Sequence, residues 1–303
     1  MAPTNEQEQK VLINFQGQKA TLYCSSTEEL AKKIQSTFHI APQRQRITYT
    51  SDSSTKQPNS PLREGDKLSD LTEEQRLSLS LKDLGPQVGW RTVFVLEYLG
   101  PLLIHCFFFY YGNEFIWKGQ VARKSFVQTV AFVMVAFHYG KRLFESVFVH
   151  RFSHSTMPIS SLVKNCLHYY LIGGVGIAYF LYSPHYEKIL SPGEVRLLSG
   201  LFFLCEGLNF YSHLLLMSLR PAGSKVRKIP EGGLFKFVSC PNYLFEALAW
   251  GVFAYFTGLP SAWLFAGLSF WQMQAWAQKK QARYLREFSG YPKERKAIIP
   301  FVW

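Results

Sequence analysis

The sequence predicts an α-helical membrane domain with six or seven transmembrane helices, preceded by a small N-terminal α+β domain. One observation behind this prediction is the uneven charge of the 303-residue chain. Residues 1–90 hold 11 Lys+Arg against 11 Asp+Glu, whereas the remainder holds 22 against 10. The other is a series of apolar stretches after residue 92, most of them long enough to cross a hydrocarbon core as a helix. The +12 net charge therefore lies among the apolar stretches, which indicates membrane orientation and anionic ligands.

Residues 1–84 carry the signals of a compact domain. Residues 10–24 alternate apolar and polar positions around a Gln-Gly pair, which is typical of a β-hairpin with a tight turn. A capped amphipathic helix that ends near Phe38 is expected next, followed by strands near 46–50 and 77–81. This order of elements resembles ubiquitin, but the terminal Gly-Gly tail is lacking. We therefore expect a cytosolic ubiquitin-like domain that docks on the membrane domain or on a partner, and not a conjugation tag.

The motif GPQVGW opens a linker that we assign to residues 85–92, and the membrane domain then occupies residues 93–303. Spanning helices are expected at residues 93–112, 125–140, 165–183, 194–218, 236–258 and 261–278. No signal peptide is predicted, because residues 1–30 are polar and include acids. The N-terminus is therefore expected in the cytosol, and six crossings return the C-terminus to the same side.

Basic segments flank the predicted spans mainly on one side. With a cytosolic N-terminus, the segments 141–151, 220–228 and 279–296 all lie on the cytosolic side, as the positive-inside rule expects. A smaller basic group that includes Lys124 falls on the opposite side. This conflict leaves room for a seventh, short or re-entrant span, for which Leu143–Phe152 is the candidate.

The pattern of residues argues against several classes of site. The five cysteines lie far apart without a C-x-x-C pair, so neither a zinc site nor a disulfide framework is predicted. No pair of His and carboxylate ligands sits at ligand spacing on one helix with a third nearby, so we expect no metal. The positive charge is interleaved with apolar spans instead of gathered on a soluble face, so nucleic acid is not expected as a partner.

Polar residues inside the predicted spans are candidate functional residues, because ionisable groups at membrane depth are energetically unfavourable. Glu97 lies one turn into the first span, and Tyr139 and Arg142 belong to a polar cluster at the end of the second. A structural role stays open for Glu97, as a carboxylate bonded to a neighbouring helix, and for Arg142, as a cytosolic anchor.

Two later helices present matching polar faces on either side of a basic loop. Asn209 and His213 share a face at i, i+4 spacing in the fourth span, as do Asn242 and Glu246 in the fifth, beside Tyr243. The loop between them holds the basic residues Arg220, Lys225, Arg227 and Lys228. This arrangement predicts a site for a multiply anionic ligand at the cytosolic face, with a hydrogen-bonded core histidine as the simpler interpretation of His213.

The C-terminal tail is basic, contains tyrosines and then returns to the apolar sequence IIPFVW. We expect this return to hold Tyr284, Tyr291, Lys293 and Arg295 near the membrane domain, where they could close a lid over a bound cofactor. The simpler interpretation is a solvated cytosolic end.

Several long motifs resemble one enzyme family: FVHRFSHSTMP at 148–158, SLRPAGSKVRKIP at 218–230, VSCPNYLFE at 238–246 and YLREFSGYPKERKAIIPF at 284–301. The resemblance is to the very-long-chain trans-2-enoyl-CoA reductases, within the steroid 5α-reductase family, and it covers nearly the whole chain. It implies a multi-pass enzyme of the endoplasmic reticulum membrane, with both termini cytosolic, that uses NADPH for the last step of fatty-acid elongation and so feeds sphingolipid synthesis. The implied partners are a very-long-chain 2-enoyl-CoA substrate, the lipid bilayer, and the elongase, ketoacyl reductase and dehydratase of the elongation cycle.

The resemblance also implies roles for individual residues. The residues that match cofactor positions of the family are Arg142, Asn209, Arg220, Asn242, Glu246, Tyr284 and Tyr291. His213, which stands where the steroid reductases carry an aspartate, completes this cofactor set together with Arg227, Lys228 and Arg295. Glu97 and Tyr139 match the carboxylate and the tyrosine that polarise the substrate carbonyl.

The implied reaction transfers hydride from NADPH to C3 of a 2-enoyl thioester, while a donor stabilises the carbonyl oxygen and a proton reaches C2. We expect Tyr139, supported by Glu97, to hydrogen-bond the thioester oxygen, with Tyr243 as the rival acid. Two alternatives stay open: a steroid 5α-reductase that acts on an enone, and a non-catalytic membrane scaffold of the elongation machinery. The ubiquitin-like domain and the FVHRFSHSTMP motif favour the acyl-CoA substrate, and polar faces buried in a bilayer oppose the scaffold.

Overall fold

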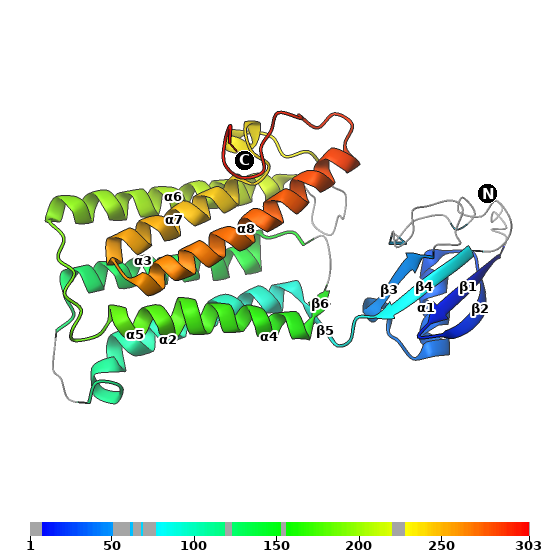
Figure 1. Cartoon of the computed structure of the whole chain (residues 1–303), viewed down its shortest axis with the longest axis horizontal. Helices are drawn as coiled ribbons and strands as arrows, with labels where there is room; N and C mark the ends of the chain where they lie inside the picture. The colour runs from blue at the N-terminus through cyan, green and yellow to red at the C-terminus, as the bar shows by residue number, and fades with distance from the viewer. Residues whose placement is uncertain are drawn as a thin grey trace. The chain divides into compact units, whose positions relative to one another are not determined.

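The computed structural model describes residues 8–50, 61–62, 68, 77–118, 123–152, 156–219 and 228–302. The chain forms two compact units (Figure 1). One unit comprises Met1–Val88 with Thr156–Ile159, and the other comprises Gly89–Ser155 with Ser160–Trp303.

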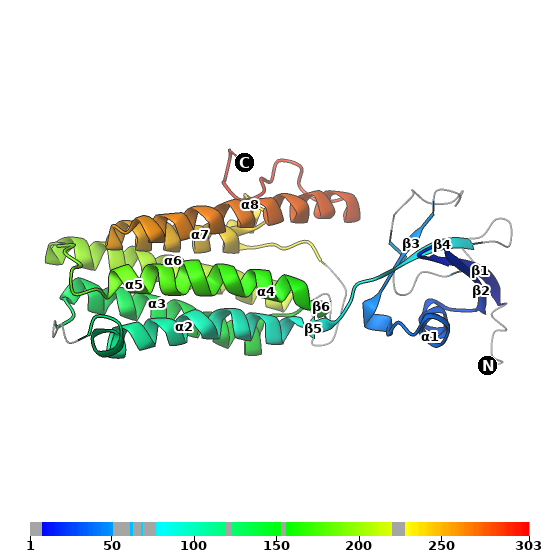
Figure 2. The ribbon, with the colours of Figure 1, turned by 60° about the horizontal axis from the view of Figure 1, so that its bottom comes forward.

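The described residues of the N-terminal unit form a four-stranded sheet and one long helix (Figure 2). The strands are β1 (Gln9–Phe15), β2 (Gln18–Cys24), β3 (Gln45–Tyr49) and β4 (Leu77–Asp83), in the order β2-β1-β4-β3. β1 is antiparallel to β2 and parallel to β4, and β3 is antiparallel to β4. Helix α1 (Thr27–Phe38) and a short 3-10 turn, η1 (Pro42–Arg44), connect β2 to β3.

Local sequence explains the hairpin and the helix of this unit. Both central residues of the β1–β2 turn, Gln16 and Gly17, have positive φ values of 49° and 86°, as the type I′ turn of a two-residue hairpin requires. Ser26 caps α1 by accepting from a backbone N–H of the first turn at 3.2 Å. Leu30 and Ile34 are fully buried in the core between α1 and the sheet. The predicted hairpin, helix and two later strands are confirmed.

The second unit is a bundle of helices. The long helices are α2 (Trp90–Phe115), α3 (Phe126–Phe144), α6 (Pro192–Ser218), α7 (Pro241–Thr257) and α8 (Pro260–Glu287). A composite helix runs without a break through α4 (Ile159–Leu167), the π-helix η4 (His168–Gly176) and α5 (Ile177–Leu181). A π-helical turn, η3 (Glu145–Val149), extends α3, and a 3-10 turn, η5 (Gly233–Lys236), precedes α7. The short strands β5 (Gln87–Gly89) and β6 (Thr156–Pro158), which belong to the first unit except for Gly89, pair with each other.

Each of the six predicted spanning segments coincides with a helix in the described part of the chain. Two of them, Trp90–Phe115 and Pro192–Ser218, are long and apolar enough to cross a membrane by length and composition. The count of six or seven crossings therefore stays a prediction. The segment Leu143–Phe152 forms no separate helix, because it holds the end of α3 and the π-helical turn that extends it. Residues 85–92, expected as a linker, contain β5 and the first turn of α2.

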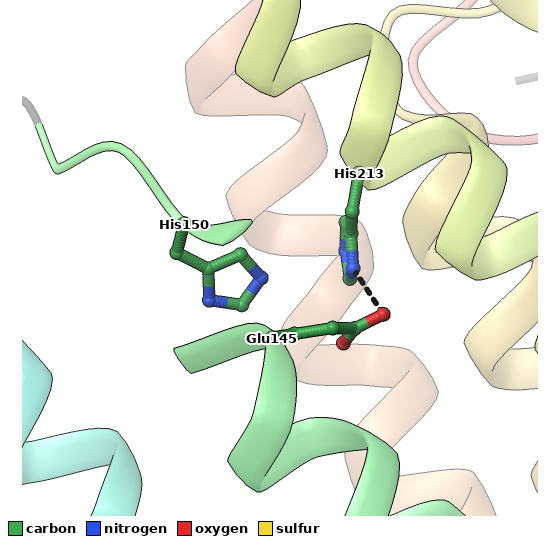
Figure 3. Close-up of side chains that lie close together, drawn as sticks. All are labelled: Glu145, His150 and His213. Atoms are coloured by element: carbon green, nitrogen blue, oxygen red, sulfur yellow. Dashed lines mark ion pairs between the residues drawn. The ribbon is translucent and has the colours of Figure 1, made fainter. Parts of the chain in front are cut away.

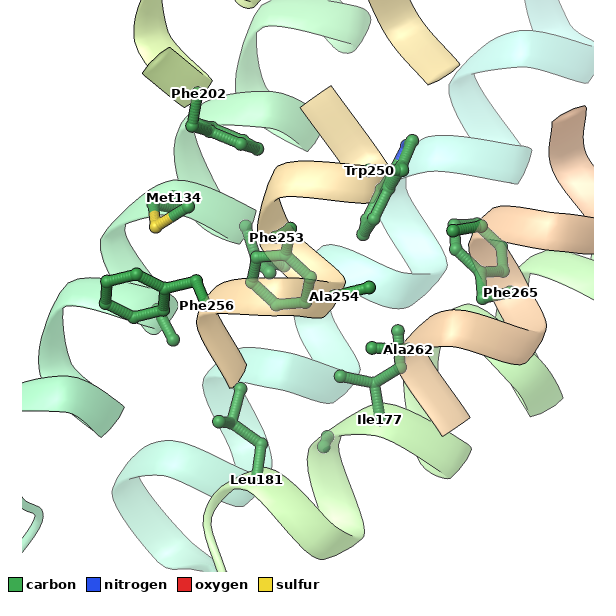
Figure 4. Packing of buried hydrophobic residues seen from close by; sticks show 14 of the residues in the cluster. Met134, Ile177, Leu181, Phe202, Trp250, Phe253, Ala254, Phe256, Ala262 and Phe265 are labelled. Atoms are coloured by element: carbon green, nitrogen blue, oxygen red, sulfur yellow. The ribbon is translucent and has the colours of Figure 1, made fainter. Parts of the chain in front are cut away.

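The helices pack around a common apolar core. α6 packs against α7, α7 against α8, α8 against the composite helix, and the composite helix against α2, while α3 packs against α2, α6 and α7. The core holds large side chains of several helices, among them Phe202, Trp250, Phe253, Phe256 and Phe265 (Figure 4). All five are at most 3% exposed. This packing fixes the rotation of each helix and so decides which of its polar residues face inward.

Capping residues define where these helices begin and end. Ser125 and Ser191 start α3 and α6 with reciprocal capping boxes, in which Gln128 and Glu194 return a hydrogen bond to the cap. Proline occupies the first helical position of α6, α7 and α8, where its missing N–H is not needed. Gly258, with φ of 66°, ends α7 in the left-handed conformation, and α8 begins two residues later. The α7–α8 hairpin is therefore specified locally.

Large apolar side chains also cover the outside of the helical unit. Leu103, Tyr110, Phe126, Leu197 and Trp271 are between 58% and 69% exposed. Extended apolar surface of this kind marks contact with a membrane or with another protein. The helices are thus apolar on the outward face as well as in the core, which is the pattern of buried or membrane helices.

Two glycines allow α2 and the composite helix to approach closely. A Cβ at Gly100 of α2 would lie 2.0 Å from the ring of Tyr170 in η4, and a Cβ at Gly174 would lie 2.9 Å from the side chain of Ile104. The Tyr170 ring is held in place by its hydroxyl, which donates to the Leu96 carbonyl at 2.6 Å. Close backbone approach at this contact therefore depends on the absence of side chains.

Gly100→Ala should lower the thermal unfolding midpoint of the detergent-solubilised protein, because the added methyl group must displace the Tyr170 ring. Overpacking of this kind destabilises by about 1–3 kcal/mol. Gly267→Ala in α8 is the matched control, since a Cβ there meets nothing within 4 Å. Equal midpoints for the two variants would contradict the close approach of α2 and η4.

Candidate functional site

A network of buried charged and polar side chains lies where α2, α3, α6 and α7 meet. Arg142 on α3 is at its centre and is 6% exposed. Its Nη2 donates to the Tyr98 hydroxyl on α2 at 2.8 Å, and its Nη1 donates to Glu145 Oε2 at 2.6 Å. Its Nε lies 3.9 Å from Glu246 Oε1 on α7, and its guanidinium lies 4.9 Å from the centre of the Tyr98 ring. One cation thus joins three helices.

Glu145 is a fully buried carboxylate at the start of η3. Its Oε1 lies 3.0 Å from Nδ1 of His213 on α6 (Figure 3) and 3.5 Å from the ammonium of Lys141. The ring of His150 packs edge-on against His213, with centroids 4.9 Å apart. The ligand atoms of Glu145, His150 and His213 lie within 4.8 Å of one another. Because Arg142 and Lys141 already pair with this carboxylate and would repel a divalent cation, we assign no metal to the group.

A second buried carboxylate, Glu206 on α6, pairs with α3. Its Oε1 lies 2.7 Å from His138 Nδ1, and its Oε2 lies 2.8 Å from the Lys141 ammonium. Lys141 also donates to Asn209 Oδ1. Asn209 Nδ2 in turn donates to the backbone carbonyl of Asn242 on α7 at 2.8 Å. Asn209 therefore bridges α3 and α7, with both ends of its amide held by the protein.

The two polar faces predicted for α6 and α7 meet in this network. Asn242 Nδ2 lies 3.4 Å from His213 Nε2, and Asn209 Nδ2 lies 3.5 Å from Glu246 Oε2. These four residues and Arg142 are thereby brought to one place. The predicted sharing of a face by each pair is confirmed, while contact of these residues with a cofactor stays a prediction.

Glu97 and Tyr139 are both buried, but the structure shows no hydrogen bond between them in its described part. Glu97 Oε1 accepts from the side-chain amide of Asn165 on α4 at 2.8 Å. The Tyr139 hydroxyl has no hydrogen-bond partner among the described residues. Its ring packs against those of His138 and Trp250, at centroid distances of 5.1 Å and 5.9 Å. The expected support of Tyr139 by Glu97 is thus not seen, because the Glu97 carboxylate bonds to α4.

Tyr243, the rival acid, lies in different surroundings. Its ring centroid is 6.3 Å from that of Trp276 on α8, and the ammonium of Lys280 lies 5.9 Å from the ring. The side chain of Asn242, one residue earlier, lies 3.4 Å from His213 on α6. Successive helical residues point about 100° apart, so Tyr243 faces in a different direction. Tyr139 therefore stands in the core of the bundle, whereas Tyr243 packs against α8.

The C-terminal tail folds back onto the segment before α7. The backbone N–H groups of Ser239 and Cys240 donate to tail carbonyls at 2.7 Å and 3.1 Å. Tyr291 stacks on Tyr284 with ring centroids 5.3 Å apart, and its hydroxyl lies 2.7 Å from the Ser239 hydroxyl. Arg295 lies over the Tyr291 ring at 4.9 Å. The predicted return of the tail to the helical unit is confirmed, and its closure over a cofactor stays a prediction.

The basic loop between α6 and α7 is described only at its end. Lys228 is exposed there. Arg220 and Arg227, predicted with it as cofactor residues, lie outside the described residues, as does Lys225. Their contribution to anion binding stays a prediction.

Several buried polar atoms of the site lack a hydrogen-bond partner among the described residues. They are Arg142 Nε, Glu145 Oε1, Glu206 Oε2, Asn242 Oδ1, Arg295 Nε and the Tyr139 hydroxyl. A buried donor or acceptor left unpaired destabilises by about 1–3 kcal/mol, so native proteins keep few of them. The two carboxylate oxygens lie in ion pairs with Lys141 and His213, and the other four atoms belong to residues that the sequence predicts as cofactor or substrate contacts. This coincidence indicates that a polar ligand completes the site.

Comparison with known proteins gives the family. Residues 155–303 match the family model described as 3-oxo-5-alpha-steroid 4-dehydrogenase. A Dictyostelium discoideum protein named "Very-long-chain enoyl-CoA reductase" is 43% identical over 291 residues, which cover 94% of this chain and 95% of that relative. The chain belongs to this enoyl-CoA reductase family.

Other relatives extend the family match. A Caenorhabditis elegans protein named "Probable very-long-chain enoyl-CoA reductase art-1" is 40% identical over 298 residues, or 93% of this chain and 94% of the relative. A Mus musculus protein named "Trans-2,3-enoyl-CoA reductase-like" is 33% identical over 235 residues, or 75% of this chain and 64% of the relative. The family resemblance seen in the sequence motifs is therefore confirmed.

In this member of the enoyl-CoA reductase family, several residues of the network were not predicted as site residues, among them Tyr98, Lys141, Glu145 and Glu206. Helical spacing is the signal that could have found two of them. Glu145 lies three residues after Arg142, and Glu206 lies three before Asn209, so each shares a helical face with a predicted residue. Tyr98 shows no such spacing, and only the packing of α2 against α3 reveals its bond to Arg142.

Glu206→Leu should destabilise the protein strongly, because it leaves His138 buried without its carboxylate and Lys141 with only the more distant carboxylate of Glu145, at 3.5 Å. Removal of one partner of a buried ion pair lowers the free energy of unfolding by about 3–5 kcal/mol. The double variant Glu206→Leu/Lys141→Met should recover much of this loss, since no unpaired charge remains at that position. Thermal unfolding in detergent measures both, and a single variant as stable as the wild type would show that the pair does not hold α3 to α6.

Proposed function

We propose that this protein reduces the C2=C3 double bond of very-long-chain trans-2-enoyl-CoA, the last step of the fatty-acid elongation cycle, with NADPH as the hydride source. Relatives that match more than nine-tenths of the chain carry the name of this enzyme. The observation that carries the proposal is the set of unpaired buried polar atoms on Arg142, Asn242 and Tyr139. A membrane scaffold gains nothing from such atoms, whereas a reductase needs them for its cofactor and its substrate.

The buried network fits a nicotinamide cofactor. Among the described residues, Asn242 Oδ1 is an acceptor without a hydrogen-bond partner and suits the carboxamide N–H of nicotinamide, and Arg142 Nε is a donor whose contact with Glu246 Oε1, at 3.9 Å, is too long for a hydrogen bond. The residues proposed to hold the nicotinamide end are Arg142, Asn209, His213, Asn242 and Glu246. Those proposed for the rest of the cofactor are Tyr284, Tyr291 and Arg295, with Arg220, Arg227 and Lys228 at the 2′-phosphate. When bound, NADPH supplies the hydride that adds to C3 of the enoyl thioester.

The substrate side requires stabilisation of the thioester oxygen as negative charge develops on it. The Tyr139 hydroxyl is buried and has no hydrogen-bond partner in the described part of the chain, so it can donate to that oxygen without breaking a bond to those residues. Glu97, oriented by Asn165 at 2.8 Å, is the second polar group proposed for this side. A proton must also reach C2 from an acid. We assign this step to Tyr139, with Tyr243 as the alternative.

The exposed apolar side chains support a place for the helical unit in a bilayer. We assign it to the endoplasmic reticulum membrane, with six crossings and both termini in the cytosol. Lys124, which falls on the side opposite to the other basic segments, donates to Asn113 Oδ1 at 2.9 Å and to the Tyr182 carbonyl at 2.6 Å. Its ammonium group is bonded within the protein, so Lys124 says little about the orientation of the chain in the membrane.

The N-terminal unit supports the ubiquitin-like assignment. Its central strands β1 and β4 are parallel, an antiparallel strand flanks each of them, and α1 follows the first hairpin. On this proposal the unit is a cytosolic adaptor. The proposed partners are the elongase, the ketoacyl reductase and the dehydratase of the elongation cycle, and the product feeds sphingolipid synthesis.

An assay of the purified full chain with a very-long-chain 2-enoyl-CoA and NADPH, followed by loss of NADPH absorbance, tests the function. We expect turnover of the acyl-CoA and none of a 3-oxo-4-ene steroid. Because the matching family model is described by a steroid activity, turnover of the steroid alone would assign an enone substrate instead. If the protein reduces neither substrate, the alternative of a non-catalytic membrane scaffold would be favoured.

Tyr139→Phe removes only a hydroxyl, and kcat should fall by about 100-fold to 1000-fold, as it does when an oxyanion donor is lost. NADPH binding should change little, because the Tyr139 hydroxyl makes no hydrogen bond to the proposed cofactor residues in the described structure. Tyr243→Phe is the matched control and should have the smaller effect. If Tyr139→Phe kept near-normal activity and Tyr243→Phe were inactive, the proton donor would instead be Tyr243, on the face of α7 that packs on α8.

NADPH should be preferred to NADH, because the basic loop offers charge to the 2′-phosphate. Lys228→Met should raise KM for NADPH alone. The ratio of kcat/KM for NADPH to kcat/KM for NADH should therefore fall. Lys236→Met, an equal loss of charge at an exposed site in η5, is the control. Comparable kcat/KM for both cofactors in the wild type would refute a 2′-phosphate site.

A further inference from the structure

Gly173 lies in the π-helix η4, directly against the hydroxyl of Tyr139. A Cβ at this position would lie 3.0 Å from the Tyr139 hydroxyl oxygen and 2.8 Å from the ring of Phe265. Both distances are shorter than ordinary van der Waals contacts, so a side chain here would have to displace these groups. The main chain of η4 therefore forms one wall of the space around the hydroxyl that is proposed to act on the substrate.

The rings beside this glycine have little freedom to move away. Tyr139 is fully buried, and its ring packs against that of Trp250. Phe265 is 1% exposed, and its ring lies 4.6 Å from that of Trp250 and 5.1 Å from that of His168, measured between centroids. Protein interiors are close-packed and transmit strain. A group added at residue 173 would therefore shift the Tyr139 hydroxyl instead of being absorbed by loose neighbours.

His105 on α2 holds the main chain of Gly173 in place. Its Nε2 lies 3.0 Å from the Gly173 carbonyl oxygen. A carbonyl can only accept, so Nε2 carries a proton and donates, whether the imidazole is neutral or charged. Its Nδ1 lies 2.8 Å from the hydroxyl of Tyr182, which directly follows α5. His105 and Tyr182 are both fully buried, so water does not compete for these bonds and Gly173 stays beside Tyr139.

The contact at Gly173 differs in kind from the one at the next residue, Gly174. A Cβ at Gly174 would meet the side chain of Ile104 on α2, which is apolar packing between helices. A Cβ at Gly173 would meet a hydroxyl that has no hydrogen-bond partner among the described residues. π-helical segments are rare and are often found at functional sites. Of these two glycines of η4, Gly173 is thus the one that touches a group proposed for the chemistry.

We propose that Gly173 is a positioning residue for the reduction. The absence of a side chain lets the Tyr139 hydroxyl lie where it can donate to the thioester oxygen, and His105 keeps the glycine at this place. The inference rests on the proposed function, because it requires Tyr139 to act on the substrate. A catalytic donor must be held within about 0.5 Å of its productive position, so the displacement that a methyl group forces is large enough to impair it.

Gly173→Ala in the purified full chain in detergent tests the inference. With a very-long-chain 2-enoyl-CoA and saturating NADPH, kcat should fall by about tenfold, because the rate falls steeply when a reacting group is misplaced. The dissociation constant for NADPH, measured by protein fluorescence, should stay close to that of the wild type. Gly174→Ala is the matched control, since it adds the same methyl group one residue along η4 but meets Ile104 instead of Tyr139. It should keep kcat near the wild-type value.

The same change in the Tyr139→Phe background separates positioning from support of the fold. The hydroxyl is absent there, so Gly173→Ala should cause no further loss of kcat. A purely structural role would lower kcat by the same factor in both backgrounds, and that result overturns the inference. A Gly173→Ala variant with the kcat of the wild type overturns it as well.

If Gly173→Ala does not fold, His105→Phe takes its place, because it removes the donor that holds the Gly173 carbonyl. It should lower kcat in the wild-type background but not in the Tyr139→Phe background, and equal factors in both are contrary to the inference. An active wild type in which Tyr139→Phe loses rate and Gly173→Ala does not overturns the inference alone. A wild type without enoyl-CoA turnover, or a Tyr139→Phe variant with undiminished kcat, overturns the proposed function or the role of Tyr139 in it, and the inference with them.

Discussion

Charges that cannot reach water must be paired, and this constraint organises the helical unit. α3 carries Lys141 and Arg142 on adjacent positions, and the buried carboxylates Glu145 and Glu206 compensate them from η3 and α6. Each ion removed from water loses several kcal/mol of solvation, which only close pairing restores. Because η3 continues α3, a shift of α3 along α6 by one turn would separate Glu206 from Lys141 and His138. The network therefore specifies a register that apolar packing alone would leave less strictly defined.

A few buried polar atoms of the network have no hydrogen-bond partner among the described residues, and these atoms are available to bind a ligand. Most donors and acceptors of the network are saturated by protein groups, as Asn209 is by Lys141 and the Asn242 carbonyl. The exceptions include atoms on Arg142, Asn242 and Tyr139, which stand beside an otherwise well-packed apolar core. A stable core can carry a small number of unsatisfied groups, and natural proteins concentrate them at functional sites.

Features that depend on contiguous sequence are predictable from it. The β1–β2 turn follows from the need for positive φ at Gln16 and Gly17, and the helices follow from apolar stretches bounded by caps and prolines. The sharing of one face by Asn209 and His213 follows from helical spacing. Several long motifs also identify the family, because they retain the order and identity of many residues at once.

Partners across helices were decided only by the tertiary structure. Glu97 bonds to Asn165, 68 residues away, instead of supporting Tyr139, and Tyr98 bonds to Arg142 across 44 residues. Such contacts depend on the rotation and depth of each helix, which are set by the packing of the whole core and not by local spacing. By itself the sequence determined the helices, their polar faces and the family. The structure decided which polar groups are paired and which are left for a ligand, because burial and pairing are properties of the assembled bundle.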